Sequence, residues 1–116
     1  MIFGAHVIVF THDAEADRNF FRDVLGMESV DSGGGWLIFA MPPSEIAFHP
    51  TDESPTNEIY LLCDDLGSEM RQLEAKGVAF SAVDEERWGT VTRFTLPGGT
   101  TIGLYQPKHS VALKRD

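Results

Sequence analysis

The chain repeats one pattern of elements in its two halves. In each half a short apolar segment carries one side chain able to bind a metal, and an acidic residue follows that side chain seven positions later. These residues are His6 and Asp13 in the first half, and Glu58 and Asp65 in the second. A helix that ends at a glycine and a run of strands follow in both halves. Such repetition indicates two copies of one supersecondary unit, each with a sheet face to cover.

Local signals give each half the order strand, helix, strand, strand, strand. Asp13 is a favourable N-cap for the first helix, and Gly26 ends that helix because a left-handed C-terminal residue costs little only for glycine. Asp65 and Gly77 play the same parts in the second half. Seven of the eight strands have bounds, at residues 5–10, 36–41, 45–49, 58–63, 78–83, 88–96 and 101–106, and the second strand of the first half is predicted between Gly26 and Gly33. The predicted fold class is α+β, with two βαβββ modules.

Length and punctuation favour a single domain over residues 1–116, which is long enough to bury its own core. The predicted division is module one at about 3–50, a linker at about 51–56, module two at about 57–107 and a frayed tail at 108–116. The start of the chain has no basic leader, and the apolar run Val7–Phe10 is too short to cross a bilayer. The one cysteine, Cys63, has no partner in the chain and fits a reducing cytoplasm.

The charge balance excludes two classes of partner. Nine basic residues stand against eighteen acidic ones, for a net charge of −9. A surface of that sign repels nucleic acid and anionic lipid, so neither nucleic acid nor a membrane is an expected partner. A cationic or aromatic small organic molecule is the kind of ligand that an acidic surface with tryptophans favours.

Two segments resemble the vicinal oxygen chelate superfamily, which includes glyoxalase I, bleomycin-resistance proteins and extradiol dioxygenases. Residues 19–27 (NFFRDVLGM) are similar to the end of that family's first helix, and residues 102–107 (IGLYQP) are similar to its last strand. The resemblance runs from Ala5 to Pro107. It implies a curved, pseudo-symmetric eight-stranded sheet with helices on the outer face, and a homodimer. It leaves the activity open, because one fold hosts many functions.

The resemblance also implies four metal-ligand positions inside the sheet. His6 and Glu58 match two of them, whereas Ala47 and Gly103 stand where the family has glutamate, so the four-ligand site is incomplete. Alternate residues of a strand share a face, so His49 would point the same way as Ala47. His6, Glu58 and His49 then form a candidate triad for one divalent metal, Fe, Zn, Mn or Ni. The alternative is that His6 and Glu58 simply form a buried ion pair.

Other residues are candidates for binding or proton transfer. Glu58, Tyr60 and Tyr105 are the catalytic candidates, as groups able to accept or donate a proton. Trp36 and Trp88 each follow a turn and are candidates to line a ligand site, although both are equally compatible with a core. Arg93 is a candidate carboxylate-binding group, with a solvated sheet position as the alternative. His12 and His109, in a loop and in the tail, are interpreted as surface residues.

Two functions from different classes follow. The first is a small-molecule-binding protein of the glyoxalase, bleomycin-resistance and dioxygenase type with an incomplete metal site. The second is a divalent-metal-dependent lyase or extradiol-type dioxygenase that uses His6, Glu58 and His49. A dimeric interaction module is a third, less specific interpretation.

Overall fold

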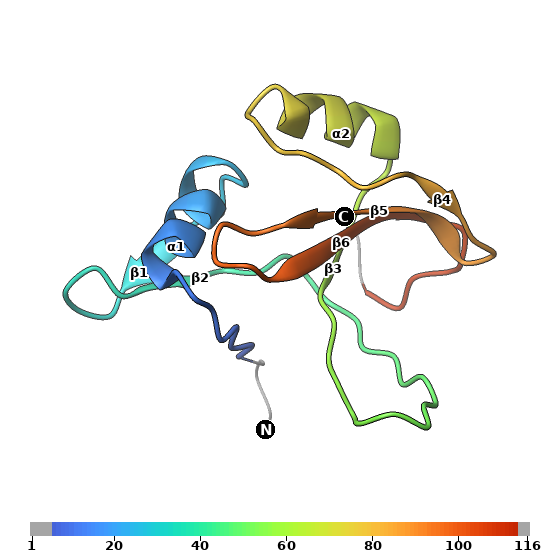
Figure 1. The fold of residues 1–116 in the computed structure, drawn as a ribbon, viewed down its shortest axis with the longest axis horizontal. Helices are drawn as coiled ribbons and strands as arrows, with labels where there is room; N and C mark the ends of the chain where they lie inside the picture. Colours follow the sequence, from blue (N-terminus) through green and yellow to red (C-terminus); the bar gives the residue numbers. More distant parts are fainter. Residues whose placement is uncertain (1–5, 114–116) are drawn as a thin grey trace.

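The structure, a computed structural model, describes residues 6–113 of the chain (Figure 1). The first residue of the predicted strand 5–10 and the outer ends of module one and of the tail lie outside this range. The elements in order are α1 (Ala14–Asp23), β1 (Ser29–Asp31), β2 (Leu37–Phe39), β3 (Tyr60–Leu62), α2 (Leu66–Glu74), β4 (Asp84–Glu85), β5 (Gly89–Thr95) and β6 (Thr101–Pro107). The α+β class is therefore correct. Neither helix in this range has the length or apolar content needed to cross a lipid bilayer.

Both helices begin and end as their sequences predict. The Asp13 carboxylate accepts a hydrogen bond from the backbone N–H of Ala16 at 3.0 Å, which caps α1. Asp65 caps α2 in the same way, accepting from Ser68 N–H at 3.1 Å. Gly26 and Gly77 follow the helices with φ of 69° and 93°, a region that favours glycine.

A four-stranded sheet in the order β3-β6-β5-β4 forms the centre of the second half. The neighbours β3 and β6 are parallel, and the other two pairs are antiparallel. Figure 1 shows α2 lying over one face of this sheet. That face and the helix enclose the core, formed by the buried residues Leu66, Leu73, Val78, Phe94, Leu96, Ile102 and Leu104.

Helix α1 reaches the second half through packing and one buried carboxylate. The Phe20 ring stacks on the Phe94 ring with centroids 5.9 Å apart. At the β5–β6 turn, Asp17 Oδ1 accepts a hydrogen bond from Gly98 N–H at 2.7 Å, and Asp17 is only 8% exposed. The His12 N–H donates to the Gly98 carbonyl at 3.2 Å. A side chain at position 98 would collide with Thr11 and Asp17, so only glycine allows this approach.

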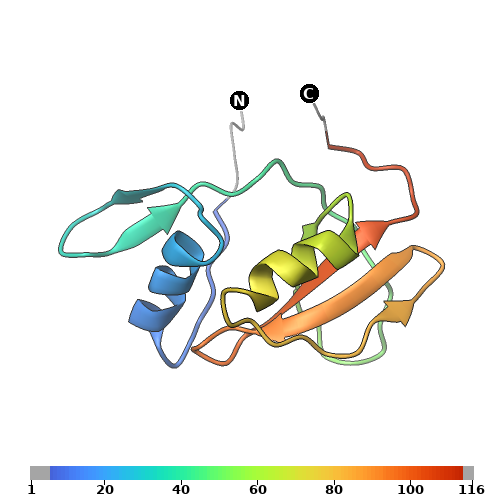
Figure 2. The same ribbon diagram turned by 90° about the horizontal axis from the view of Figure 1, so that it is seen from above.

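The first half forms fewer strands than its sequence predicts. Its two strands, β1 and β2, pair only with each other in an antiparallel hairpin beside α1 (Figure 2). Residues 6–10 and 45–49, both predicted as strands, belong to no strand, so the described residues contain six strands and the eight-stranded sheet is not confirmed. The physical reason is pairing, because a strand persists only when its backbone N–H and C=O groups find a partner strand.

In the second half the strand predictions hold better. Residues 89–95 and 101–107 form β5 and β6, close to the predicted ranges, while β3 is shorter than the predicted 58–63. The predicted strand 78–83 is the exception, because the edge strand β4 comes directly after it at residues 84–85. Val78 instead packs into the core beneath the end of α2.

Candidate functional site

The face of the four-stranded sheet opposite α2 carries three aromatic rings in mutual contact, here called the aromatic cluster: Tyr60, Trp88 and Tyr105. The ring centroids of Trp88 and Tyr105 lie 5.0 Å apart, those of Tyr60 and Tyr105 5.6 Å and those of Tyr60 and Trp88 6.2 Å. All three pairs are edge-to-face, the arrangement that the charge distribution of aromatic rings favours. Trp88 is 37% exposed, so part of the cluster is open to a ligand.

Strand alternation explains why these rings share a face. Phe94, Ile102 and Leu104 point into the core under α2, so their neighbours Arg93 and Tyr105 point the other way. The register places both Tyr60 and Arg93 directly opposite Gly103, on the two sides of β6. Strand pairing alone therefore brings Tyr60, Arg93 and Tyr105 onto one surface.

Gly103 makes room for the Tyr60 ring. A Cβ atom at position 103 would overlap with the Tyr60 ring atoms Cδ1 and Cε1, so the ring rests directly against the backbone of β6. With no side chain to cross, Tyr60 extends over β6 as far as Arg93. Position 103 was predicted as a vacant metal-ligand position, and its space is filled by the aromatic ring of the neighbouring strand.

The Tyr60 hydroxyl forms hydrogen bonds with one acidic and one basic side chain. It donates to Glu58 Oε2 at 2.7 Å and accepts from Arg93 Nη2 at 3.0 Å. The Arg93 guanidinium carbon also lies 5.7 Å from the centre of the Tyr60 ring. Burial raises the pKa of the Tyr60 hydroxyl above its ordinary value, and the bond to Glu58 adds to the rise while Arg93 opposes it. Tyr60 is therefore a neutral hydroxyl at physiological pH, held in one orientation.

Tyr105 has a partner that the sequence interpretation missed. Its hydroxyl lies 3.0 Å from Nε2 of His109, and the two rings are 5.9 Å apart. Burial, followed by the negative charge of Glu45, raises the pKa of Tyr105 above its ordinary value. His109 is exposed, as predicted, yet it contacts the cluster. The only sequence signal for this contact was proximity, since His109 lies four residues after Tyr105 and two residues after the end of β6.

The predicted metal triad is not assembled in the structure. His6 and His49 are both exposed and lie outside every strand. Residues 6–113 contain no group of three or more His, Cys, Asp or Glu side chains placed to hold a metal ion. Glu58 bonds to Tyr60, and the described residues form no ion pair between His6 and Glu58. In this arrangement His6, Glu58 and His49 do not fit a metal, and that ligand set stays a prediction.

Trp36 lies apart from the aromatic cluster. It occupies the β1–β2 hairpin and is 61% exposed, with the Arg18 guanidinium 4.4 Å from its ring centre. Of the six catalytic and ligand-binding candidates, the structure thus brings together Glu58, Tyr60, Trp88, Arg93 and Tyr105, and leaves Trp36 elsewhere.

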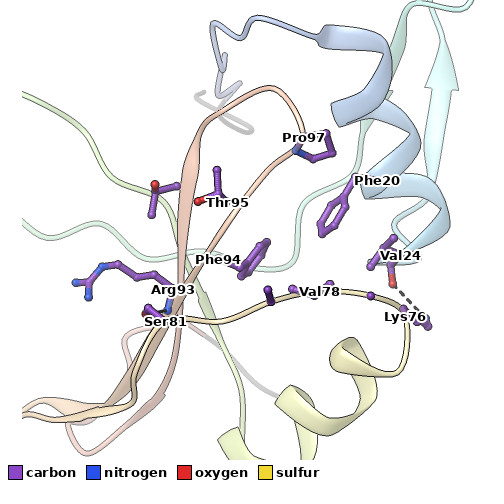
Figure 3. Close-up of a pocket in the computed structure, with 12 residues that line it drawn as sticks. Phe20, Val24, Lys76, Val78, Ser81, Arg93, Phe94, Thr95 and Pro97 are labelled. Atoms are coloured by element: carbon purple, nitrogen blue, oxygen red, sulfur yellow. Dashed lines mark hydrogen bonds between the residues drawn. The ribbon is translucent and has the colours of Figure 1, made fainter.

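A groove of ≈ 700 Å³ lies on the other side of the sheet, between α1 and the second half. Phe20 of α1 faces Phe94 of β5 across it, and Lys76 Nζ donates to the Val24 carbonyl at 3.1 Å at one end (Figure 3). Figure 3 also shows that Arg93 borders this groove with its backbone while its guanidinium points away. The groove is mainly an apolar contact zone between the two halves.

Comparison with known proteins agrees with this fold. Residues 5–104 match the Glyoxalase/Bleomycin resistance protein/Dioxygenase superfamily. The chain belongs to this superfamily, whose members often bind divalent metals, and the resemblance to vicinal oxygen chelate proteins is confirmed.

Individual relatives differ in what they do. The chain is 28% identical over 111 residues to a manganese-dependent 2,3-dihydroxybiphenyl 1,2-dioxygenase from Geobacillus genomosp. 3, with 86% of this chain and 35% of the relative covered, so it spans about a third of that enzyme. The antibiotic-binding protein TnmS3 from Streptomyces sp. CB03234 is 25% identical, with a TM-score of 0.64 and coverage of 93% and 100%. The fosfomycin resistance protein FosX from Listeria monocytogenes shares the fold at 16% identity, with a TM-score of 0.61 and coverage of 93% and 96%.

Proposed function

We propose that this protein binds a small aromatic molecule, and that the aromatic cluster with Arg93 is its binding surface. The observation that carries the proposal is the convergence of Tyr60, Trp88, Tyr105 and Arg93 on one partly exposed sheet face. Such a surface offers ring faces and edges for a flat ligand and one cation for orientation, the combination typical of small-molecule sites. The similarity to an antibiotic-binding protein supports the same class of function.

The energetics favour a flat ligand. Aromatic pairs contribute about 0.5–1.5 kcal/mol each beyond their buried area, so a fused ring that contacts two of the three rings gains from both. The three cluster residues already contact one another, so binding orders few additional side chains. The surface is therefore preorganised for an aromatic guest.

The two tryptophans provide a matched test. The probe is 2-naphthamide, a neutral fused-ring compound, titrated by isothermal titration calorimetry. Trp88→Ala removes a cluster ring and is expected to abolish measurable binding, whereas Trp36→Ala changes a residue on the distant hairpin and is expected to preserve it. The proposal is overturned if neither 2-naphthamide nor its carboxylate analogue 2-naphthoate binds, or if Trp36→Ala weakens binding as much as Trp88→Ala.

The manganese-dependent relative favours a second candidate, a divalent-metal-dependent lyase or dioxygenase. Its proposed ligands are His6, Glu58 and His49, which requires residues 6–10 and 45–49 to move toward Glu58. Elemental analysis of protein purified without chelators tests this candidate. One transition metal per chain that is lost in His6→Ala would support the enzyme, and chain without metal after growth with Mn, Fe, Zn and Ni would exclude it.

A homodimer is also proposed, from the apolar side chains that the first half leaves exposed. Phe10 is 91% exposed and Phe48 87%, with Ile8 and Ile46 at 64% and 80%. These residues belong to the two predicted strands that lack a partner, and a second copy would supply both pairing and burial. Light scattering is expected to give twice the chain mass, and Phe10→Ser with Phe48→Ser to shift it toward the monomer. A wild-type monomer at high concentration would contradict this.

The free, half-buried thiol of Cys63 accords with the proposed cytoplasmic location.

A further inference from the structure

Arg93 is held in place by a neutral group. Its Nη2 donates to the Tyr60 hydroxyl, and it takes part in neither of the ion pairs that residues 6–113 form, Arg22–Asp23 and Lys108–Glu85. The chain has eighteen acidic residues, yet within residues 6–113 no carboxylate is bonded directly to the Arg93 guanidinium. Most of the five N–H groups of the guanidinium are therefore available to another acceptor.

The Tyr60 hydroxyl fixes where this fork lies. Glu58 accepts a hydrogen bond from the Tyr60 hydroxyl, so an oxygen lone pair of that hydroxyl is directed to Arg93. The Tyr60 ring cannot slide along β6, because it is seated over Gly103. The hydrogen bond to Tyr60, followed by the negative charges of Glu58 and Asp84, holds the pKa of Arg93 above its ordinary value. The guanidinium is thus a permanent, positioned cation beside three aromatic rings.

We infer that the ligand is an aromatic carboxylate, whose ring packs on the aromatic cluster and whose carboxylate takes the free N–H groups of Arg93. A guanidinium matches a carboxylate with two parallel hydrogen bonds, and charged hydrogen bonds are roughly twice as strong as neutral ones. Physiological salt screens charges more than about 8 Å away, so the net charge of −9 opposes an anion here only through near neighbours such as Glu58, whose carboxylate is already hydrogen-bonded to Tyr60. The contact with Arg93 decides the specificity.

This inference rests on the proposed function and deepens it, and three probes of one shape separate the two. They are 2-naphthoate, 2-naphthamide and 2-naphthylmethylammonium, titrated by calorimetry at physiological salt. We expect 2-naphthoate to bind about tenfold more tightly than 2-naphthamide, which corresponds to the stronger charged hydrogen bond, and the ammonium probe to bind most weakly. If the amide binds and the carboxylate binds no more tightly, the inference fails and the proposed function stands. If none of them binds, both fail.

Variants locate the effect at Arg93. Arg93→Gln is expected to remove the preference for 2-naphthoate over 2-naphthamide. Arg71→Gln makes the same charge change on exposed α2, and it is expected to leave that preference intact. Tyr60→Phe keeps the ring and removes the hydroxyl that orients Arg93, so it is expected to reduce the preference several-fold. A preference that survives Arg93→Gln, or that disappears in Arg71→Gln, would overturn the inference. Binding of 2-naphthamide by each variant reports that its surface is folded.

Discussion

The two halves of the molecule carry the same sequence pattern, but only the second half forms a sheet covered by its helix. The second half has a four-stranded sheet, a covering helix and a cluster of buried apolar residues. The first half has an equally well capped helix, a short hairpin and large apolar residues in solvent. Figure 1 shows the contrast directly, with the stretch between β2 and β3 looping away from the sheet.

What separates the halves is pairing over a long distance in sequence. In the second half, β3 and β6 pair in parallel although about forty residues separate them. The corresponding segments of the first half, 6–10 and 45–49, lie a similar distance apart and do not pair. Capping residues act over a few positions, so both helices form equally well. A parallel strand pair also requires the long segment between its two strands to fold back, which costs loop-closure entropy.

The largest expected effect compares two isoleucines, one from each half. Ile102 is 1% exposed, so Ile102→Ala is expected to lower the free energy of unfolding by about 2–5 kcal/mol through lost burial and a cavity. Ile46 is 80% exposed, and Ile46→Ala is expected to change it by less than about 0.5 kcal/mol in the monomer. Urea denaturation in the Phe10→Ser, Phe48→Ser background, where the chain is expected to be monomeric, measures both values. Equal losses would mean that the first half is packed as tightly as the second.

Gly103→Ala tests how closely the second half is packed at the site. The added methyl group meets the Tyr60 ring, and we expect a loss of about 1–3 kcal/mol of stability from overpacking, with weaker binding of aromatic probes. Gly67→Ala in α2 is the matched control, since its nearest neighbour is the flexible end of Arg71 at 3.4 Å and helix propensity favours alanine. A Gly103→Ala variant as stable as the wild type would show that Tyr60 does not rest on β6.

Asp17→Ala tests the connection between the halves. It removes the acceptor for the Gly98 N–H in a buried place, and an expected loss of about 1–3 kcal/mol follows from leaving that donor unpaired. Asp23→Ala, at the exposed end of the same helix, removes only a solvent-exposed partner of Arg22 and is expected to have a much smaller effect on stability. Chemical denaturation of both variants gives the comparison, and similar losses would remove Asp17 from this role.

The smallest expected effect concerns the thiol of the second half. Burial, then the negative charges of Glu69 and Asp64, raise the pKa of Cys63 to about 11. The folded chain therefore keeps this proton at pH values where the unfolded chain loses it, so this group lowers stability as pH rises from the ordinary thiol pKa of about 8.5 toward 11. Alkylation by iodoacetamide at pH 8 is expected to be many-fold slower in folded than in urea-unfolded protein. Equal rates would contradict the burial of Cys63.

The features that the sequence predicted correctly are those set by neighbouring residues. Asp13 and Asp65 cap their helices, and Gly26 and Gly77 follow them, because each of these contacts spans only a few positions. The superfamily could also be recognised from the sequence, because residues 19–27 and 102–107 are short continuous segments that do not depend on the pairing of distant strands.

The features that escaped prediction depend on register. Nothing local to Gly103 indicates that Tyr60 covers it, because that contact arises only when β3 and β6 align as they do. Alternation within one strand does not tell which residues of different strands stand side by side, so the bond between Tyr60 and Arg93 could not be predicted. The triad of His6, Glu58 and His49 was implied by the family resemblance together with side-chain alternation along residues 45–49, and residues 6–10 and 45–49 belong to no strand of the structure.

Gly103 has a consequence for how this face of the protein changes over evolution. A side chain at position 103 and the ring of Tyr60 would occupy the same space. A mutation of Gly103 therefore displaces the Tyr60 ring and does not simply add a side chain to this face. A single codon change from glycine to a longer acidic residue would evict the ring, release Arg93 from its anchor and place a carboxylate in the vacated space. Such a variant would present a different set of charges on this face, while the core on the other face of the sheet, under α2, would keep its residues.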